Sequence, residues 1–197
     1  MRRLLLLVAT LFLIQPAQAQ ENNAALHQLF DQQWQRGLRD YPENAVFYGD
    51  NRYNDRWTDM SLGAIAVREA GDREALQSLR AIDRTQLSAA DQLNYDTFEW
   101  QLKQSIARQA FREYLMPISH QGGVQTADGL IELLAFNTEK DYRDWLARLN
   151  ALPTLIDQNI VLLREGAKLG MTPPKAIMKR VPNQIAAQVV DDPTKSA

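Results

Sequence analysis

The stretch from residue 139 to residue 185, "EKDYRDWLARLNALPTLIDQNIVLLREGAKLGMTPPKAIMKRVPNQI", decides the fold class. Its apolar residues recur at steps of three and four, which is the period of an amphipathic helix. The first such stripe is Tyr142, Trp145, Leu146, Leu149 and Leu152. The whole stretch therefore reads as helix after helix.

Local signals divide this stretch. Thr138 and Asp141 predict a helix start. Pro153 is expected to open the next helix near its first position, and Gly170 to end that helix. The last amphipathic helix is expected over residues 177–189, where Pro182 can kink it.

The same periodicity extends toward the N-terminus. Further helices are expected over residues 26–41, 61–80, 88–115 and 130–136. No stretch alternates like a strand. We therefore predict an all-α fold, an irregular bundle of about six to seven helices, forming one domain over residues 20–197.

Two of these helices carry more specific predictions. Residues 88–115 are expected to form the longest helix, with Ser88 and Asp91 at its start and Pro117 ending it. Gly71 can split the helix over residues 61–80.

The first nineteen residues are typical of a secretory signal peptide. Arg2 and Arg3 precede an apolar run over residues 4–14. A small-x-small pattern then predicts cleavage between Ala19 and Gln20. The alternative is a membrane anchor, but the run is shorter than the roughly 20 apolar residues that span a bilayer. We expect a periplasmic or secreted protein that is not membrane-bound after cleavage.

The composition excludes several classes of function. The chain has no cysteine, so disulfides, thiol catalysis and zinc–thiolate sites are excluded. Its net charge of −2 argues against an electrostatic nucleic-acid binder, which would present a basic face.

Residues 41–57, "YPENAVFYGDNRYNDRW", are predicted to be an aromatic loop. Aromatic side chains are costly to expose, so we expect Tyr53 and Trp57 to pack against the first and third helices. Gly49 is expected to allow a turn. Asp55 and Asp59 are expected to hold backbone groups.

No catalytic, cofactor-binding or metal-binding residue is assigned from the sequence. His27 lies one helical turn before Asp31, but a stable zinc site needs three or four ligands. His120 lies in the Gly-rich loop "ISHQGGVQTADG", where a turn is favoured over a ligand contact. Asp96 and Glu99 are interpreted as a solvated helix face.

Three segments together resemble one family. The segment "YPENAVFYGDNRYNDRWTDMS" resembles the opening motif of the family. The segment "LRAIDRTQLSAADQLNYDTFEWQL" resembles its second motif, and residues 139–185 resemble its third. The matching positions are Pro42, Ala45, Gly49, Tyr53, Asp55, Asp59 and Ser61; Leu87, Ser88, Asp91, Asn94, Tyr95 and Asp96; and Asp141, Tyr142, Leu149, Pro153, Gly166, Gly170, Pro173 or Pro174, and Gln184.

The family is the bacterial domain of unknown function 885. The resemblance implies an exported, helical protein similar to zinc metallopeptidases of the gluzincin kind. In the family the H-E-x-x-H-type zinc helix lies far downstream, and this chain has no such motif. It therefore resembles the N-terminal third of the family. No cofactor is expected in this chain, and zinc is expected only in full-length relatives.

Three hypotheses remain open. The first is an exported segment of a metallopeptidase-like family without catalytic activity of its own, whose partner is a missing C-terminal catalytic region or a second copy. The second is a self-sufficient binding or adaptor module whose surface is residues 41–57 with 119–128. The third is an enzyme that uses the carboxylates of residues 88–115.

Overall fold

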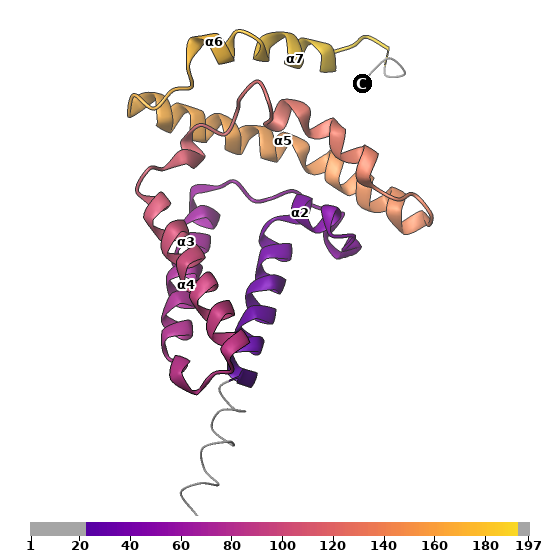
Figure 1. The fold of residues 1–197 in the computed structure, drawn as a ribbon. Helices are drawn as coiled ribbons and strands as arrows, with labels where there is room; N and C mark the ends of the chain where they lie inside the picture. The colour runs from indigo at the N-terminus through magenta and orange to yellow at the C-terminus, as the bar shows by residue number, and fades with distance from the viewer. Residues whose placement is uncertain (1–22, 193–197) are drawn as a thin grey trace, which may run out of the picture. The chain divides into compact units, whose positions relative to one another are not determined.

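The computed structural model describes residues 23–192, which fold into helices and turns (Figure 1). Within this range there is no strand, and Ser119 and Gly122 form an isolated bridge. The α-helices are residues 23–40, α2 (Pro42–Phe47), α3 (Leu62–Arg80), α4 (Ala89–Gln109), α5 (Glu139–Lys168), α6 (Lys175–Met178) and α7 (Val181–Gln188). The 3₁₀ segments are η1 (Asn51–Tyr53), η2 (Arg84–Gln86), η3 (Glu113–Leu115) and η4 (Val124–Leu133). The all-α prediction is confirmed.

The proposed signal peptide, with its cleavage site at Ala19 and Gln20, lies outside the described residues. Among the described helices, none combines the length and the apolar character that a membrane span requires.

Two compact units are distinguished. Unit 1 comprises Met1–Arg36 and Val67–Ala110, described from residue 23 onward, and unit 2 comprises Gly37–Ala66 and Phe111–Ala197, described as far as residue 192. The single domain expected over residues 20–197 stays a prediction.

Unit 1 is held together by one apolar core. Its buried members come from helix 23–40, α3, α4 and the turn before α4: Leu26, Leu29, Ala75, Leu79, Leu87, Tyr95 and Leu102. Phe30 and Phe98 pack edge to face beside it, with ring centroids 5.2 Å apart. This is the arrangement that aromatic pairs favour.

Gly71 does not split α3, which runs unbroken from Leu62 to Arg80. A Cβ atom on Gly71 would lie 1.9 Å from the Arg36 guanidinium. The missing side chain thus leaves room for Arg36 to reach Asp72, with an N···O distance of 2.5 Å. Gly71 therefore allows a close contact between α3 and helix 23–40.

The prediction for α4 was right at its start and wrong at its end. The Ser88 hydroxyl accepts the Asp91 N–H at 3.1 Å, as a helix cap does. The helix ends at Gln109, well before Pro117. Arg112 is left-handed (φ 48°), and η3 follows. The chain turns there, and Leu115 enters the core of unit 2 with Ile65 and Leu162.

The longest described helix is α5, and Pro153 lies inside it. The prediction that Pro153 opens a new helix was therefore wrong. Its ring removes one helical hydrogen bond, to the carbonyl of Leu149. The helix continues because it buries Arg148, Leu155, Asn159, Leu162 and Gly166 on both sides of the proline.

Glycines shape the end of α5. A Cβ on Gly166 would lie 2.7 Å from the Leu115 carbonyl oxygen, so only glycine allows η3 to approach this closely. Gly170 has φ +72° just past the helix, which confirms it as the terminator. Farther on, the expected kinked helix is two helices, and Pro182 lies in the first turn of α7.

Candidate functional site

Residues 41–60 form one wall of a cavity in unit 2. The expected loop is in part a helix: Pro42 occupies the first turn of α2, where its missing N–H costs nothing. Gly49 follows with φ +74° and makes the turn, as predicted. The Asp50 carboxylate then accepts the Arg52 N–H at 3.0 Å and starts η1.

Trp57 is the anchor of this wall. Its indole N–H donates to the Arg148 carbonyl at 2.7 Å, and its ring packs edge to face against Trp145. The expectation that Trp57 and Tyr53 pack against the first and third helices is thus corrected: Trp57 packs on α5. The Tyr53 ring lies beside the guanidinium groups of Arg52 and Arg56.

Arg148 of α5 contacts this wall at Tyr53 and Trp57. Its side chain is fully buried, stacks 5.0 Å from the Trp57 ring and donates to the Tyr53 carbonyl at 2.9 Å. Burial lowers the pKa of Arg148, and the carboxylates of Glu43, Asp55 and Asp144 oppose that shift. Its Nε and Nη1 have no hydrogen-bond partner among residues 23–192.

The second wall is residues 117–133. Gly123 has φ +144°, and a Cβ there would lie 2.5 Å from the Gln125 side-chain oxygen. The Gln125 amide donates to the Ser119 carbonyl at 2.7 Å, and the Gln184 amide of α7 donates to the His120 carbonyl at 3.0 Å. These two hydrogen bonds hold the backbone of the Gly-rich loop at Ser119 and His120.

The third wall is the buried face of α5, from Leu155 to Asn159. Gln158 ties it to the first wall. Its side-chain oxygen accepts the Met60 N–H at 2.8 Å, and its amide donates to Asp59 at 2.8 Å. Asp59 also accepts the Ser61 N–H at 2.9 Å, which confirms the prediction that Asp59 holds a backbone group.

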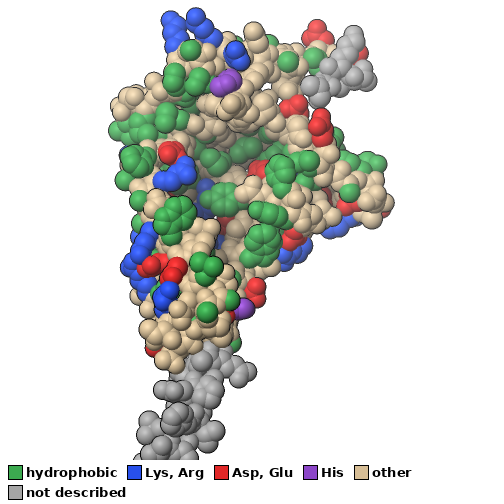
Figure 2. All heavy atoms as spheres, viewed as in Figure 1, with side chains coloured by type: hydrophobic (Ala, Val, Ile, Leu, Met, Phe, Trp, Pro, Cys, Tyr) green, Lys and Arg blue, Asp and Glu red, His purple; other side chains and the backbone are tan. Residues whose placement is uncertain are grey.

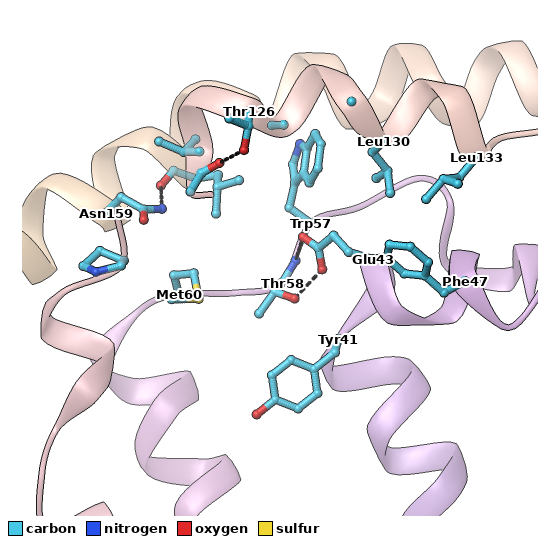
Figure 3. A pocket seen from close by; sticks show the side chains of 16 residues that line it. Tyr41, Glu43, Phe47, Trp57, Thr58, Met60, Thr126, Leu130, Leu133 and Asn159 are labelled. Atoms are coloured by element: carbon cyan, nitrogen blue, oxygen red, sulfur yellow. Dashed lines mark hydrogen bonds between the residues drawn. The ribbon is translucent and has the colours of Figure 1, made fainter. Parts of the chain in front are cut away.

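These three walls surround a cavity of about 510 Å³ (Figure 3). Apolar and aromatic side chains dominate its lining: Tyr41, Phe47, Trp57, Leu130, Leu133 and Leu155. The Glu43 carboxylate also lies at the cavity, but Thr58 donates its N–H at 3.0 Å and its hydroxyl at 2.5 Å to the two carboxylate oxygens. The cavity is therefore mainly apolar, with one anchored carboxylate.

The other family-motif residues of unit 2 have structural roles. Asp55 pairs with Arg56 at 2.7 Å, and this bond lowers the pKa of Asp55. Among the described residues, Asp55 thus bonds a side chain rather than the backbone group of another residue. Tyr142 is exposed and stacks on Phe136, and Pro173 is half-buried between α5 and α6.

Asp91, Tyr95 and Asp96 lie in unit 1, away from the cavity in sequence and in a separate core. Tyr95 is a core residue. Asp91 accepts a hydrogen bond from His27 at 2.9 Å, which is the largest cause of its lowered pKa. Asp96 accepts two bonds from Arg84 at 2.6 Å, and this pairing lowers the pKa of Asp96.

These pairings bear on the carboxylate-enzyme hypothesis. A general acid needs a pKa raised toward neutrality, whereas hydrogen bonds from Lys103 and Arg80 also lower the pKa of Glu99. Hydrogen bonds from neighbouring side chains thus lower the pKa of all three carboxylates of α4, those of Asp91, Asp96 and Glu99. Their geometry favours a structural role.

The described residues do not assemble a metal site. Within residues 23–192, no three His, Asp or Glu side chains are grouped so that they could hold a metal ion. His27 forms a hydrogen bond with Asp91 of α4, and not a metal-binding pair with Asp31. The described residues therefore do not fit a zinc site.

The sequence indicated two of the three segments that form the cavity but not the third, which belongs to α5. Residues 41–57 and 119–128 were proposed together as a surface, and both contribute to the cavity. Leu130 and Leu155 were not predicted to line it with Phe47, because their segments are far apart in sequence. The aromatic excess of residues 41–57 was the available signal.

Comparisons with known proteins identify the family. No curated protein and no solved structure matches the chain. Residues 42–197 match the family described as "Bacterial protein of unknown function (DUF885)", and this range contains two of the cavity's walls complete and all but Tyr41 of the first. The match covers more than half of the chain and agrees with the three motifs. The chain therefore belongs to the DUF885 family of bacterial proteins.

Proposed function

We propose that the chain acts by binding, and that the cavity of unit 2 takes up an aromatic or aliphatic group. The observation that carries this proposal is the lining: aromatic and aliphatic side chains from three separate segments converge on one cavity. Its carboxylate is already engaged by Thr58, so the lining offers mostly apolar contact.

The size of the cavity supports a ligand of this class. Small-molecule sites occupy about 300–1,000 Å³, and this cavity of about 510 Å³ lies within that range. Burying an aromatic group of about 150–250 Å² contributes roughly 4–6 kcal/mol before the cost of association. We therefore expect weak binding, with Kd of about a millimolar and no tighter than roughly tens of micromolar.

Two sources could supply such a group, an apolar side chain of a polypeptide or a small apolar molecule. The family resemblance favours the polypeptide. In a full-length, metallopeptidase-like relative, this segment would help to wall the substrate cleft while the zinc region lies downstream. The signal sequence supports a periplasmic or secreted location for this function.

The first experiment measures binding of a neutral fluorescent naphthylamine, N-phenyl-1-naphthylamine, to the expected mature chain, residues 20–197. Phe47→Asp should weaken binding about tenfold or more, because a carboxylate replaces an aromatic wall. Phe111→Asp is the matched control, since both residues are exposed in unit 2 (68% and 65%) and Phe111 does not line the cavity.

Equal loss of binding in both variants, or in neither, would overturn the proposal. Competition then separates the two sources. A short peptide rich in Leu and Phe should displace the naphthylamine, whereas a matched peptide of Ser and Gln should not. Bound zinc in stoichiometric amount, with peptide hydrolysis by the purified chain, would contradict a non-catalytic role.

A further inference from the structure

A second apolar surface runs along α5 and is separate from the cavity. Tyr142, Leu146, Leu149, Ile156 and Ile160 have exposed fractions between 37% and 58%, and Pro153 is also exposed. We name these six residues the α5 stripe. Their spacing is four, three, four, three and four, which is the repeat of a helix that packs against another helix.

The α5 stripe is distinct from the face that α5 uses inside unit 2. That face buries Arg148, Leu155, Asn159 and Leu162. The stripe spans the 19 residues from Tyr142 to Ile160, and 18 steps of 1.5 Å make it about 27 Å long. Exposed apolar patches rimmed by polar residues mark interaction surfaces. On the face in view in Figure 2, hydrophobic side chains lie in groups with charged side chains beside them.

The spacing of residues along the stripe is the same from either end. Its spacing is symmetric about position 151, so an antiparallel second copy would place Tyr142 opposite Ile160, Leu146 opposite Ile156 and Leu149 opposite Pro153. Two-fold dimers need such a self-complementary surface. We propose that the α5 stripe is the interface of an antiparallel homodimer.

The charges along one border of the stripe select the same orientation. Arg143, Asn150 and Asp157 are exposed and follow at seven-residue intervals. In the antiparallel pair Arg143 faces Asp157 of the second copy, twice by symmetry, and Asn150 faces its counterpart. A parallel pair would place Arg143 against Arg143 and Asp157 against Asp157. Opposite charges at such borders favour pairing, and like charges oppose it.

The first test measures the mass of the expected mature chain, residues 20–197, by sedimentation equilibrium over a range of concentrations. We expect a monomer–dimer equilibrium whose Kd rises about tenfold or more with Leu146→Glu. Leu169→Glu is the matched control: Leu169 is similarly exposed (54% against 58%), lies just past α5 and is off the stripe. A strictly monomeric chain would overturn the proposal.

Charge exchange tests the orientation. Arg143→Asp or Asp157→Arg alone should weaken the dimer, and the double variant should restore it. A double variant no better than either single variant would contradict the antiparallel pairing.

Cross-linking tests the register. The chain has no cysteine, so a single introduced cysteine reports without background. Asn150→Cys should link to its counterpart through a short bismaleimide. Arg164→Cys should not, because it lies 13 residues from the centre of the pair at position 151 and its counterpart would be about 39 Å distant. Linkage at both positions would indicate a parallel or unspecific contact and would overturn the proposal.

Discussion

Unit 1 and unit 2 differ in what they bury. The core of unit 1 is apolar, and its buried charge, Asp91, is bonded by His27, Ser88 and Asn94. The core cluster of unit 2 is smaller. Among its described residues, unit 2 also buries five polar side chains: Asn54, Thr58, Gln125, Arg148 and Asn159.

This difference assigns roles to the two units. Unit 1 closes its apolar surface into a core, as a structural element does. Unit 2 uses polar side chains to hold its chain segments and leaves an apolar cavity open. A preformed apolar cavity of this kind is the usual form of a binding site. The comparison therefore places the proposed binding function in unit 2.

The largest expected effect comes from Arg148→Ala. The substitution removes a fully buried side chain that joins Tyr53 and Trp57 to α5, and it leaves a cavity. We expect the free energy of unfolding to fall by about 4 kcal/mol in urea titration. Naphthylamine binding should be lost as well.

Arg164→Ala, at an exposed position of the same helix, is the control for Arg148→Ala. It should change the free energy of unfolding by less than about 0.5 kcal/mol. Similar effects of the two substitutions would show that Arg148 does not organise unit 2.

Leu79→Ala is the corresponding truncation of a buried side chain in unit 1. Leu79 is fully buried in that core, and its truncation should cost about 3 kcal/mol. Naphthylamine binding should persist under native conditions, because the cavity is formed by unit 2 residues. Loss of binding in a variant that is still folded by circular dichroism would contradict this separation of roles.

The sequence predicted the elements of unit 1 better than those of unit 2. Apolar periodicity located α3, and a cap signal located the start of α4. Within unit 2, Pro153 was misread because local propensity disfavours proline inside a helix. Burial on both sides of Pro153 outweighs that cost, and such burial is a tertiary effect.

In the candidate site, too, local sequence patterns did not predict the contacts between distant segments. The aromatic content of residues 41–57 indicated buried contacts, but not that Trp57 donates to the carbonyl of Arg148, 91 residues away. Nor could periodicity show that Arg148 would be fully buried, since arginine is among the residues least often found inside. Contacts of this range depend on the assembled fold.

Two glycines of unit 2 are expected to respond with opposite signs. Gly170→Ala should cost about 1 kcal/mol, because alanine is strained at φ +72°. Gly37→Ala should stabilise by about 0.5–1 kcal/mol, since Gly37 lies inside helix 23–40 and a Cβ there meets no atom within 4 Å. Thermal melts would measure both. Destabilisation by both would contradict the assigned conformations.

The smallest expected effect concerns pH and unit 1. The pKa of Asp91 is lowered in the folded chain, chiefly by the hydrogen bond from His27. Its contribution to stability is therefore present above the unfolded value of about 3.9 and is lost as pH falls through the lower folded value. Because His27 is largely exposed, we expect less than about 1 kcal/mol.

Asp91→Asn should reduce the loss of stability between pH 5 and pH 2, measured by urea unfolding at each pH. An unchanged acid dependence would show that other carboxylates account for it.

Photolabelling tests the central claim most directly. An apolar peptide carrying a diazirine is photolysed with the expected mature chain, residues 20–197, and the labelled residues are mapped by mass spectrometry. We predict labels on the cavity segments, residues 41–60 and 117–133, that an excess of unlabelled peptide abolishes. Labels confined to the α5 stripe, or to exposed Trp100 of α4, would contradict the claim that the cavity of unit 2 is the binding site.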